Sequence, residues 1–322
     1  TSLIASDKLN TNDYYFFIKH TIYIGIGFCF IIFFSSLSYE NLFKISGVMF
    51  VICFIFLLLV PIMGVEVKGS KRWLDFVFLP RFQPIELLKP FIILMIASVL
   101  SSEKKTNLYY KYLQSFIVIL PIIFLLITQP DIGQTFLIFL IWLSLIFISG
   151  INLMFFFIFF ILVLFLLFYL IIFVPKFTYI LDRLKSFFDP ASGNNYQSEK
   201  ATEAIINGGF FGKGIGEGIL KNRVPEAHTD YIVSVISEEF GVVIIILLMM
   251  IFLLFIYQVF KNLYFEKDNR IRLILVGCIS IILFQTLIHI GVNIRLFPTT
   301  GMTLPFLSYG GSSIVGTAIL SG

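Results

Sequence analysis

Apolar stretches long enough to cross a lipid bilayer recur along this sequence of 322 residues, and they constrain the fold more than any other feature. A bilayer core about 30 Å thick is crossed by about 20 helical residues, because a helix satisfies its own backbone hydrogen bonds in lipid. The alternating segments of a membrane β-barrel are absent from the sequence. Helical spans are predicted at 15–36, 43–63, 84–101, 111–128, 131–149, 153–174, 229–257 and 271–292, with a further apolar start at 311–322.

The composition agrees with this reading of the spans. Hydrophobic residues make up 58% of the chain, 40 residues are Phe, and only 13% are charged. A water-soluble domain of this size could not place so much apolar surface in water, so we expect an all-α polytopic membrane protein. The chain begins at Thr1 without a methionine and stops at Gly322, soon after the last apolar stretch begins. We expect a fragment that lacks one helix before Thr1 and most of one after Gly322.

The cysteines and the net charge narrow the range of sites and partners. Cys29, Cys53 and Cys278 fall within apolar spans and show no CxxC spacing, so neither a disulfide framework nor a zinc site is indicated. The net charge is only +4, and no basic run is interleaved with aromatic residues. The sequence therefore predicts no nucleic-acid partner, and its cysteines indicate no zinc site.

Three connections are too long or too polar to be simple turns: 64–83, 175–228 and 293–310. Counting the spans places all three on the same side of the membrane, because an even number of spans separates each from the next. We therefore expect their polar residues to converge around a cavity on one membrane face. These connections hold more Lys and Arg than the opposite ones, against the usual cytoplasmic bias, which suggests cations kept for an anionic ligand.

The stretch QPIELLK at residues 83–89 brings charge to the start of a span. Pro84 suits the first turn of a helix, because no helical hydrogen bond is lost there. Glu86 and Lys89 then share a helix face inside the membrane, where charge is costly unless it is paired or faces water. An internal ion pair that locks helix packing and a polar functional cavity remain alternatives.

Three other features have ordinary structural explanations. Arg72 and Trp73 are typical of an interfacial anchor. In TQPDIGQT, residues 128–135, Asp131 is placed to cap the next helix after a tight turn. The glycine-rich stretch within 182–218 lacks both the GxxxxGK[ST] spacing and a preceding strand, so a flexible loop is favoured over a nucleotide site.

The stretch NRVPEAHTDYIVSVISEEFG, residues 222–241, places polar groups at the mouth of a predicted span. Thr229 is a candidate N-cap, and Asp230 would lie in the first helical turn, where the helix dipole favours a carboxylate. Capping alone would explain Asp230. Glu238 would lie two turns deeper on nearly the same helix face, which capping does not explain, so the pair favours a functional site.

The stretch NIRLFPTTGMTLPFLSYGGSS, residues 293–313, combines Arg295 with two prolines and a Gly-Gly pair. A re-entrant or irregular segment that lines a cavity would keep such backbone groups satisfied. Ordinary loop packing is the alternative.

Taken together, these motifs resemble the SEDS family (shape, elongation, division, sporulation) of bacterial peptidoglycan polymerases. Ile85 stands where the family usually has serine, while the neighbouring Gln83, Glu86 and Lys89 match. The PEAHTD form is closer to the division members of the family than to the elongation members. The matching pieces are RW at 72–73, QPIELLK at 83–89, QPDIG at 129–133, NGGFFGKGIGEG at 207–218, PEAHTD at 225–230, EEFG at 238–241 and TGMTLPFLSYGGSS at 300–313.

The resemblance implies a fold of ten transmembrane helices, with residues 1–322 as a single membrane domain and 175–228 as its large periplasmic loop. It also implies an enzyme that joins lipid II units into glycan strands and releases undecaprenyl diphosphate. Asp230 matches the family's essential aspartate and would act as the base. A divalent cation could assist, although no cluster of ligands in the sequence requires one. The substrate-binding residues implied are Lys89, Arg81, Arg72, Gln83, Glu86, His228, Glu238, Arg295, Ser308 and Tyr309.

The resemblance further implies partners and a location. Beside lipid II, these are a class B penicillin-binding transpeptidase and other divisome membrane proteins, in the bacterial inner membrane at the division septum. Three alternatives stay open. A transporter would move the lipid-linked precursor through the same cavity without breaking a bond, a scaffold would hold a transpeptidase and leave Asp230 dispensable, and an elongation polymerase would share the chemistry.

Overall fold

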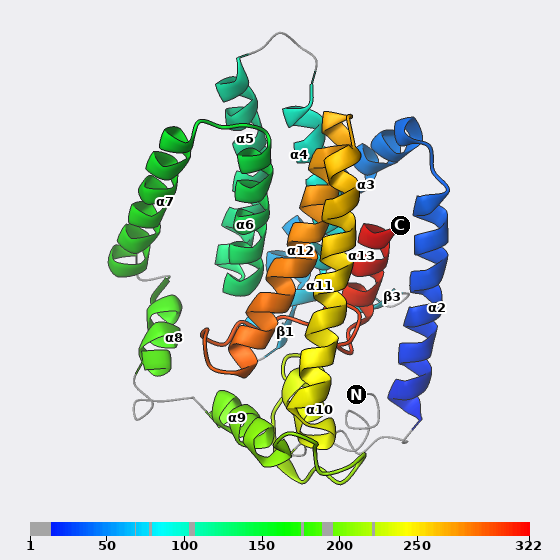
Figure 1. The fold of residues 1–322 in the computed structure, drawn as a ribbon. Coiled ribbons are helices and arrows are strands. Elements are labelled where there is room, and N and C mark those ends of the chain that lie inside the picture. Colours follow the sequence, from blue (N-terminus) through cyan, green and yellow to red (C-terminus); the bar gives the residue numbers. More distant parts are fainter. Residues whose placement is uncertain are drawn as a thin grey trace.

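The computed structural model describes residues 14–67, 69–76, 79–102, 107–174, 177–188, 196–220 and 223–322. Long helices run side by side through most of the molecule, and the polar connections gather at one end (Figure 1). The predicted helical membrane fold is confirmed. The helices that match predicted spans are α2 (Tyr15–Ser35), α3 (Tyr39–Met63), α4 (Pro84–Leu100), α5 (Leu108–Thr128), α6 (Ile132–Ile148), α7 (Leu153–Phe173), α12 (Asn269–Asn293) and α13 (Gly311–Ser321).

Helix α4 forms the centre of the bundle. It packs against α3, α5, α12 and α13, and α13 also packs against α2. Leu88, Phe91 and Ile93 of α4 are fully buried, because neighbouring helices cover it on several sides. By length and hydropathy, five helices of the described residues could each cross a membrane alone: α2, α3, α5, α12 and α11 (Val242–Phe265).

The predicted span 229–257 is broken in two. A short helix, α10 (Ile232–Phe240), ends at Gly241, where φ is +82°, and α11 begins at the next residue. A Cβ atom at Gly241 would lie 2.1 Å from the carbonyl oxygen of Phe210, so only glycine fits there. The prediction of one continuous helix was wrong, because hydropathy does not register a break between two apolar segments.

The glycine-rich segment that precedes α10 supplies hydrogen-bond partners at the break. Backbone groups freed at a broken helix need such partners where water is scarce. The hydrogen bonds run from Lys213 N to Glu238 O, from Gly214 N to Glu239 O, from Val242 N to Gly209 O and from Val243 N to Phe210 O, at 2.9, 3.0, 3.0 and 3.4 Å.

The side chain of Glu238 fixes the same segment. It is fully buried, and its Oε1 accepts hydrogen bonds from Leu220 N at 2.8 Å and from Asn207 Nδ2 at 3.1 Å. The predicted flexible loop at 182–218 was therefore wrong for the described residues. Two helices, α8 (Thr178–Phe188) and α9 (Tyr196–Gly208), occupy much of this stretch, and the residues after α9 are packed against α10.

A small antiparallel sheet lies in the first polar connection, where no strand was predicted. Its order is β1 (Val65–Val67), β2 (Ser70–Phe76) and β3 (Leu79–Phe82). Trp73 pairs with Val65, and Leu74 pairs with Phe82. Strands β1 and β3 have only three and four residues, and β2 does not alternate between apolar and polar residues, so the sequence did not reveal the sheet. The sheet carries Arg72 and leads directly into α4.

Replacing Gly241 with alanine is expected to destabilise the protein by about 2 kcal/mol or more, because the new Cβ would meet Phe210 and the residue would keep a left-handed φ. Thermal unfolding of the detergent-solubilised protein measures the effect. The matched control is Gly25→Ala in α2, where a Cβ meets nothing within 4 Å and alanine favours the helix. Equal unfolding midpoints for the two variants would contradict this account of the break.

Candidate active site

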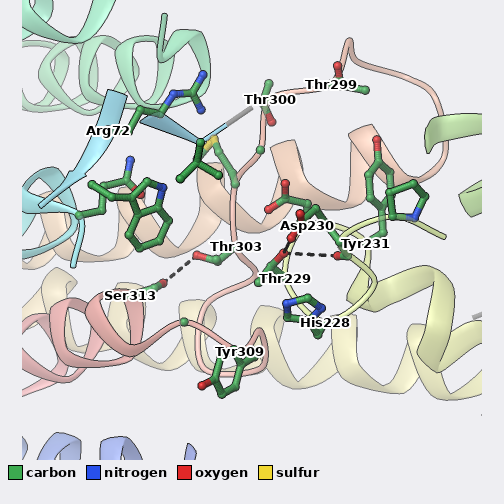
Figure 2. A pocket seen from close by; sticks show the side chains of 18 of the residues that line it. Arg72, His228, Thr229, Asp230, Tyr231, Thr299, Thr300, Thr303, Tyr309 and Ser313 are labelled. Atoms are coloured by element: carbon green, nitrogen blue, oxygen red, sulfur yellow. Dashed lines mark hydrogen bonds between the residues drawn. The ribbon is translucent and has the colours of Figure 1, made fainter. Parts of the chain in front are cut away.

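Residues from the three polar connections surround a cavity of about 1410 Å³ (Figure 2). The predicted convergence of these connections is confirmed. Within the described part of the chain, four of the predicted site residues lie outside the cavity lining: Lys89, Glu238, Arg295 and Ser308. The lining includes the other seven: Asp230, Arg72, Arg81, Gln83, Glu86, His228 and Tyr309.

Asp230 is carried by a tight turn and not by a helix. The backbone amides of Thr229, Asp230 and Tyr231 all donate to the carbonyl oxygen of Glu226, at 3.1, 3.1 and 3.2 Å. Helix α10 begins only at Ile232, with Tyr231 in the N-cap position. The predicted N-cap role of Thr229 and first-turn position of Asp230 were therefore wrong, and helix capping does not account for the Asp230 carboxylate.

Two side chains outside the cavity lining hold this turn. Asn293, at the end of α12, donates from Nδ2 to the carbonyl oxygens of Asp230 at 3.1 Å and His289 at 2.8 Å. Ser308 donates from Oγ to the carbonyl oxygen of Thr229 at 2.7 Å. The predicted Ser308 thus fixes the backbone beside Asp230 from outside the lining.

His228 and Tyr309 connect the Asp230 turn with the loop that follows α12, inside the cavity. The Tyr309 amide donates to the His228 carbonyl oxygen at 2.9 Å, and the two ring centroids lie 6.0 Å apart. Figure 2 shows both side chains below the Asp230 turn. They are placed to form an aromatic wall beside the carboxylate.

Gly301 leaves room between the Asp230 carboxylate and the Arg72 guanidinium. Its φ is +68°, and a Cβ there would lie 3.5 Å from Asp230 Oδ2 and 3.7 Å from Arg72 Nη1. Both charged groups therefore approach the same point on this loop. In Figure 2, Arg72 and Asp230 lie on either side of the loop that carries Thr300. A negative and a positive group thus face one part of the cavity.

Arg72 is held by the QPD turn between α5 and α6. Its guanidinium donates to the carbonyl oxygens of Gln129 and Pro130 and lies 3.7 Å from Asp131 Oδ1. The Asp131 carboxylate also accepts a hydrogen bond from Gln83 Nε2 at 2.8 Å. It occupies the N-cap position of α6, as predicted, and accepts from the Gln134 amide. The predicted interfacial anchor is thus a residue of the cavity wall.

Glu86 and Lys89 form a buried ion pair on α4. The Lys89 Nζ lies 2.7 Å from Glu86 Oε2 and donates to Gln285 Oε1 at 2.9 Å. The other Glu86 oxygen accepts from Gln134 Nε2 at 2.5 Å. Both ionic side chains are only 3% exposed, and only Glu86 reaches the cavity lining. The sequence left open an internal ion pair that locks helix packing and a polar functional cavity. The geometry favours the ion pair.

The remaining two predicted cations differ in position. Arg81 lines the cavity and pairs with Asp75 at 3.1 Å, with both side chains nearly half exposed. Exposed pairs of this kind contribute about 0–1 kcal/mol, so Arg81 can exchange Asp75 for another anion. Arg295 is half-buried, with a φ of +58°, in the turn after α12. Its predicted contact with substrate stays a prediction.

Arg183 and Tyr231 are among the polar residues of the cavity lining that the sequence prediction missed. Arg183 comes from α8, and the pattern DRLK at 182–185 in an amphipathic helix was the available signal. Burial, and then the neighbouring Arg72 charge, lower the pKa of Arg183. Burial, and then the Asp230 charge, raise the pKa of Tyr231, so its hydroxyl stays protonated. The cavity therefore offers a further cation and a neutral phenol.

No group of three or more His, Cys, Asp or Glu side chains in the described residues could hold a metal ion. The cavity lining includes carboxylates, guanidinium groups, ammonium groups, hydroxyls and imidazoles.

Comparisons with known proteins agree with the predicted family. The model of a family described as "Cell cycle protein", which covers FtsW, RodA and SpoVE, matches residues 1–322. The probable peptidoglycan glycosyltransferase FtsW of Buchnera aphidicola subsp. Schizaphis graminum is 34% identical over 334 residues, which cover 98% of this chain and 91% of that protein. The protein of the same name from Coxiella burnetii is 34% identical over 333 residues, covering 100% and 88%.

Two solved structures share the fold. One is a chain from a study of the structural coordination of polymerization and crosslinking by a peptidoglycan synthase complex. It superposes with a TM-score of 0.74 at 25% identity, over 94% of this chain and 86% of that chain. The rod shape determining protein RodA of Thermus thermophilus superposes with a TM-score of 0.68 at 24% identity, over 99% and 89%. The likeness to this RodA structure concerns the fold alone.

Substituting Lys89 with methionine is expected to destabilise the protein by about 3–5 kcal/mol, because Glu86 would remain as an unpaired buried carboxylate. The double variant Glu86→Gln/Lys89→Met should recover most of that loss, since no buried charge is left alone. Thermal unfolding midpoints of the single and double variants measure both effects. A double variant as unstable as the single one would show that the ion pair does not account for the burial of Lys89.

Proposed function

Because the chain belongs to the FtsW, RodA and SpoVE family of cell cycle proteins, we propose that it is a peptidoglycan glycosyltransferase embedded in the membrane by many helices. The enzyme polymerises lipid II into glycan strands and releases undecaprenyl diphosphate. Relatives that align with nearly the whole chain carry the name peptidoglycan glycosyltransferase, which supports this activity.

One observation carries the proposal: a carboxylate and a guanidinium face the same point of one cavity. Asp230 Oδ2 and Arg72 Nη1 both lie close to the Cβ position of Gly301. Glycosyl transfer from a lipid diphosphate needs a base for the attacking hydroxyl and positive charge for the leaving group. The cavity brings both kinds of group to one place.

The reaction follows from these two groups. A sugar hydroxyl of one lipid II attacks the anomeric carbon of another, and Asp230 accepts the hydroxyl proton. The new glycosidic bond forms while the bond from the anomeric carbon to the diphosphate oxygen breaks, and the diphosphate leaves with the electron pair. General-base catalysis of this kind contributes about 10²–10⁴-fold to the rate. Guanidinium groups in a cavity of low dielectric stabilise the developing negative charge.

The wider cellular role is part of the same proposal. The polar end of the bundle faces the periplasm, and the protein acts at the division septum of the bacterial inner membrane. Its partners are a class B penicillin-binding transpeptidase and other divisome membrane proteins. The FtsW relatives support a division role, and the likeness to a chain of a peptidoglycan synthase complex supports a cross-linking partner.

Substituting Asp230 with asparagine should lower glycan formation by about two orders of magnitude or more, because asparagine keeps the shape of the side chain and removes its basicity. Binding of lipid II should stay near that of the parent protein. The measurement is polymerisation of labelled lipid II by the purified protein in detergent, beside a binding assay. The matched control is Asp182→Asn, since Asp182 is an exposed carboxylate on α8 that lines the same cavity.

The outcomes separate the proposed enzyme from its alternatives. Glycan formation in detergent, with no membrane to cross, excludes a pure transporter and a pure scaffold. An Asp230→Asn protein that polymerises at the parent rate would remove Asp230 from the role of base. Equal losses in the Asp182→Asn and Asp230→Asn proteins would indicate a general effect of cavity charge.

The partner is tested by purification from native membranes with an affinity tag on this protein. A single-pass class B transpeptidase is expected to co-purify, because the fold resembles a chain from a study of polymerization and crosslinking by a peptidoglycan synthase complex. Adding the purified partner should raise glycan formation in the same assay. Full activity in the absence of any such partner, together with failure to co-purify one, would contradict this part of the proposal.

A further inference from the structure

Arg183 extends from α8 to the cavity and contacts the loop that follows α12. Its Nη1 donates to the carbonyl oxygen of Thr299 at 3.1 Å. It is half-buried and belongs to the cavity lining. The side chain is therefore held in place by a neutral partner, with its charge left for another group.

Among the described residues, Arg183 lacks the close carboxylate partner that three other cations of this region have. Arg72, Arg81 and Lys89 each lie within 4.0 Å of a carboxylate, whereas Arg183 does not lie that close to any carboxylate of the described residues. Its neighbour Asp182 is exposed and forms no ion pair with another of the described residues. A partly desolvated cation without a counter-ion is unfavourable. An anion in the cavity would remove that cost.

The charge around Arg183 also favours a ligand with more than one negative charge. Asp131 acts on both Arg72 and Arg183, but its carboxylate is already engaged by Arg72 and by Gln83. Two guanidinium groups therefore share one carboxylate. Guanidinium groups carry the opposite charge to phosphate, and their planar donors bind two phosphate oxygens through paired hydrogen bonds.

Arg183 and Arg72 lie beside the same loop segment as Asp230, the proposed base. Arg183 contacts Thr299, and Gly301, two residues later in the loop, lies beside both Arg72 and Asp230. The two cations and the carboxylate thus border one short loop segment. A diphosphate placed between the guanidinium groups would lie on the same loop as the group that accepts the proton.

We propose that Arg183 and Arg72 together form the site for the diphosphate of the lipid-linked sugar substrate. This assignment rests on the proposed function, and it gives Arg183 a binding role that the sequence motifs did not indicate. Lys89 is not required for it, because Glu86 neutralises Lys89, which lies outside the cavity lining.

The test is direct binding of undecaprenyl diphosphate to the purified protein in detergent. Arg183→Gln keeps a donor for Thr299 and removes the charge, so it should weaken binding at least about tenfold, as expected for a lost hydrogen bond to a charged group. Arg183→Lys, which keeps the charge, should lose less. The matched control is Lys185→Gln, since Lys185 is an exposed cation of the same helix and the same cavity, and its affinity should stay near that of the parent.

Two further probes identify the ligand. Inorganic pyrophosphate should compete with undecaprenyl diphosphate in the parent protein and much less in Arg183→Gln, whereas the anionic phospholipid phosphatidylglycerol should not compete. If phosphatidylglycerol displaces the diphosphate lipid equally well, the site recognises membrane phospholipid and the proposal is wrong. Unchanged binding by a folded Arg183→Gln protein, or an equal loss in Lys185→Gln, would overturn it as well.

The binding measurement is independent of the proposed function. Should the protein fail to polymerise lipid II while Arg183→Gln still weakens diphosphate binding, the anion site stands and the enzymatic proposal falls. Should the protein polymerise lipid II with Arg183→Gln at the parent affinity and rate, the enzymatic proposal stands and the anion site falls.

Discussion

The break between α10 and α11 is the constraint on which the polar end of the molecule depends. A bilayer offers no water to backbone groups that a broken helix leaves free, so the chain itself has to supply partners. Lys213 and Gly214 supply the donors, and Gly209 and Phe210 supply the acceptors. The segment that does so is thereby fixed to α10. Because α10 is a short helix held on this support, the turn before it can place Asp230 at the cavity and not along a membrane helix.

Buried charge follows a similar rule in the rest of this region. Inside a protein of low dielectric, an ionic side chain is tolerated when an opposite charge or several hydrogen bonds accompany it. Glu86 and Lys89 satisfy one another, and Arg72 is satisfied by Asp131 together with backbone carbonyl groups. Arg183 departs from this rule in the described part of the chain. A departure of this kind inside a cavity is informative, because structural packing alone gives no reason for it.

The sequence predicted features that depend on residue type or on close neighbours in the chain. The spans follow from hydropathy, and the N-cap at Asp131 follows because its donor, Gln134, lies only three residues away. The break at Gly241 could not be predicted, since its partners come from a separate segment whose glycines suggest flexibility when read alone. The place of Arg183 in the cavity depends on Thr299, which is 116 residues away in sequence. Motifs indicated the candidate base, whereas the candidate anion site required tertiary contacts.

The two kinds of charged group in the cavity need different precision of placement for the proposed chemistry. Asp230 is a short side chain on a turn held by Glu226, Asn293 and neighbouring backbone groups. Proton transfer requires heavy atoms within hydrogen-bond reach, and small errors in position reduce the rate strongly. Arg72 and Arg183 act through long side chains, and the attraction between charges falls off more gradually with distance. A fixed carboxylate can therefore set the position of the attacking hydroxyl, while the guanidinium groups stabilise the departing diphosphate without such exact placement.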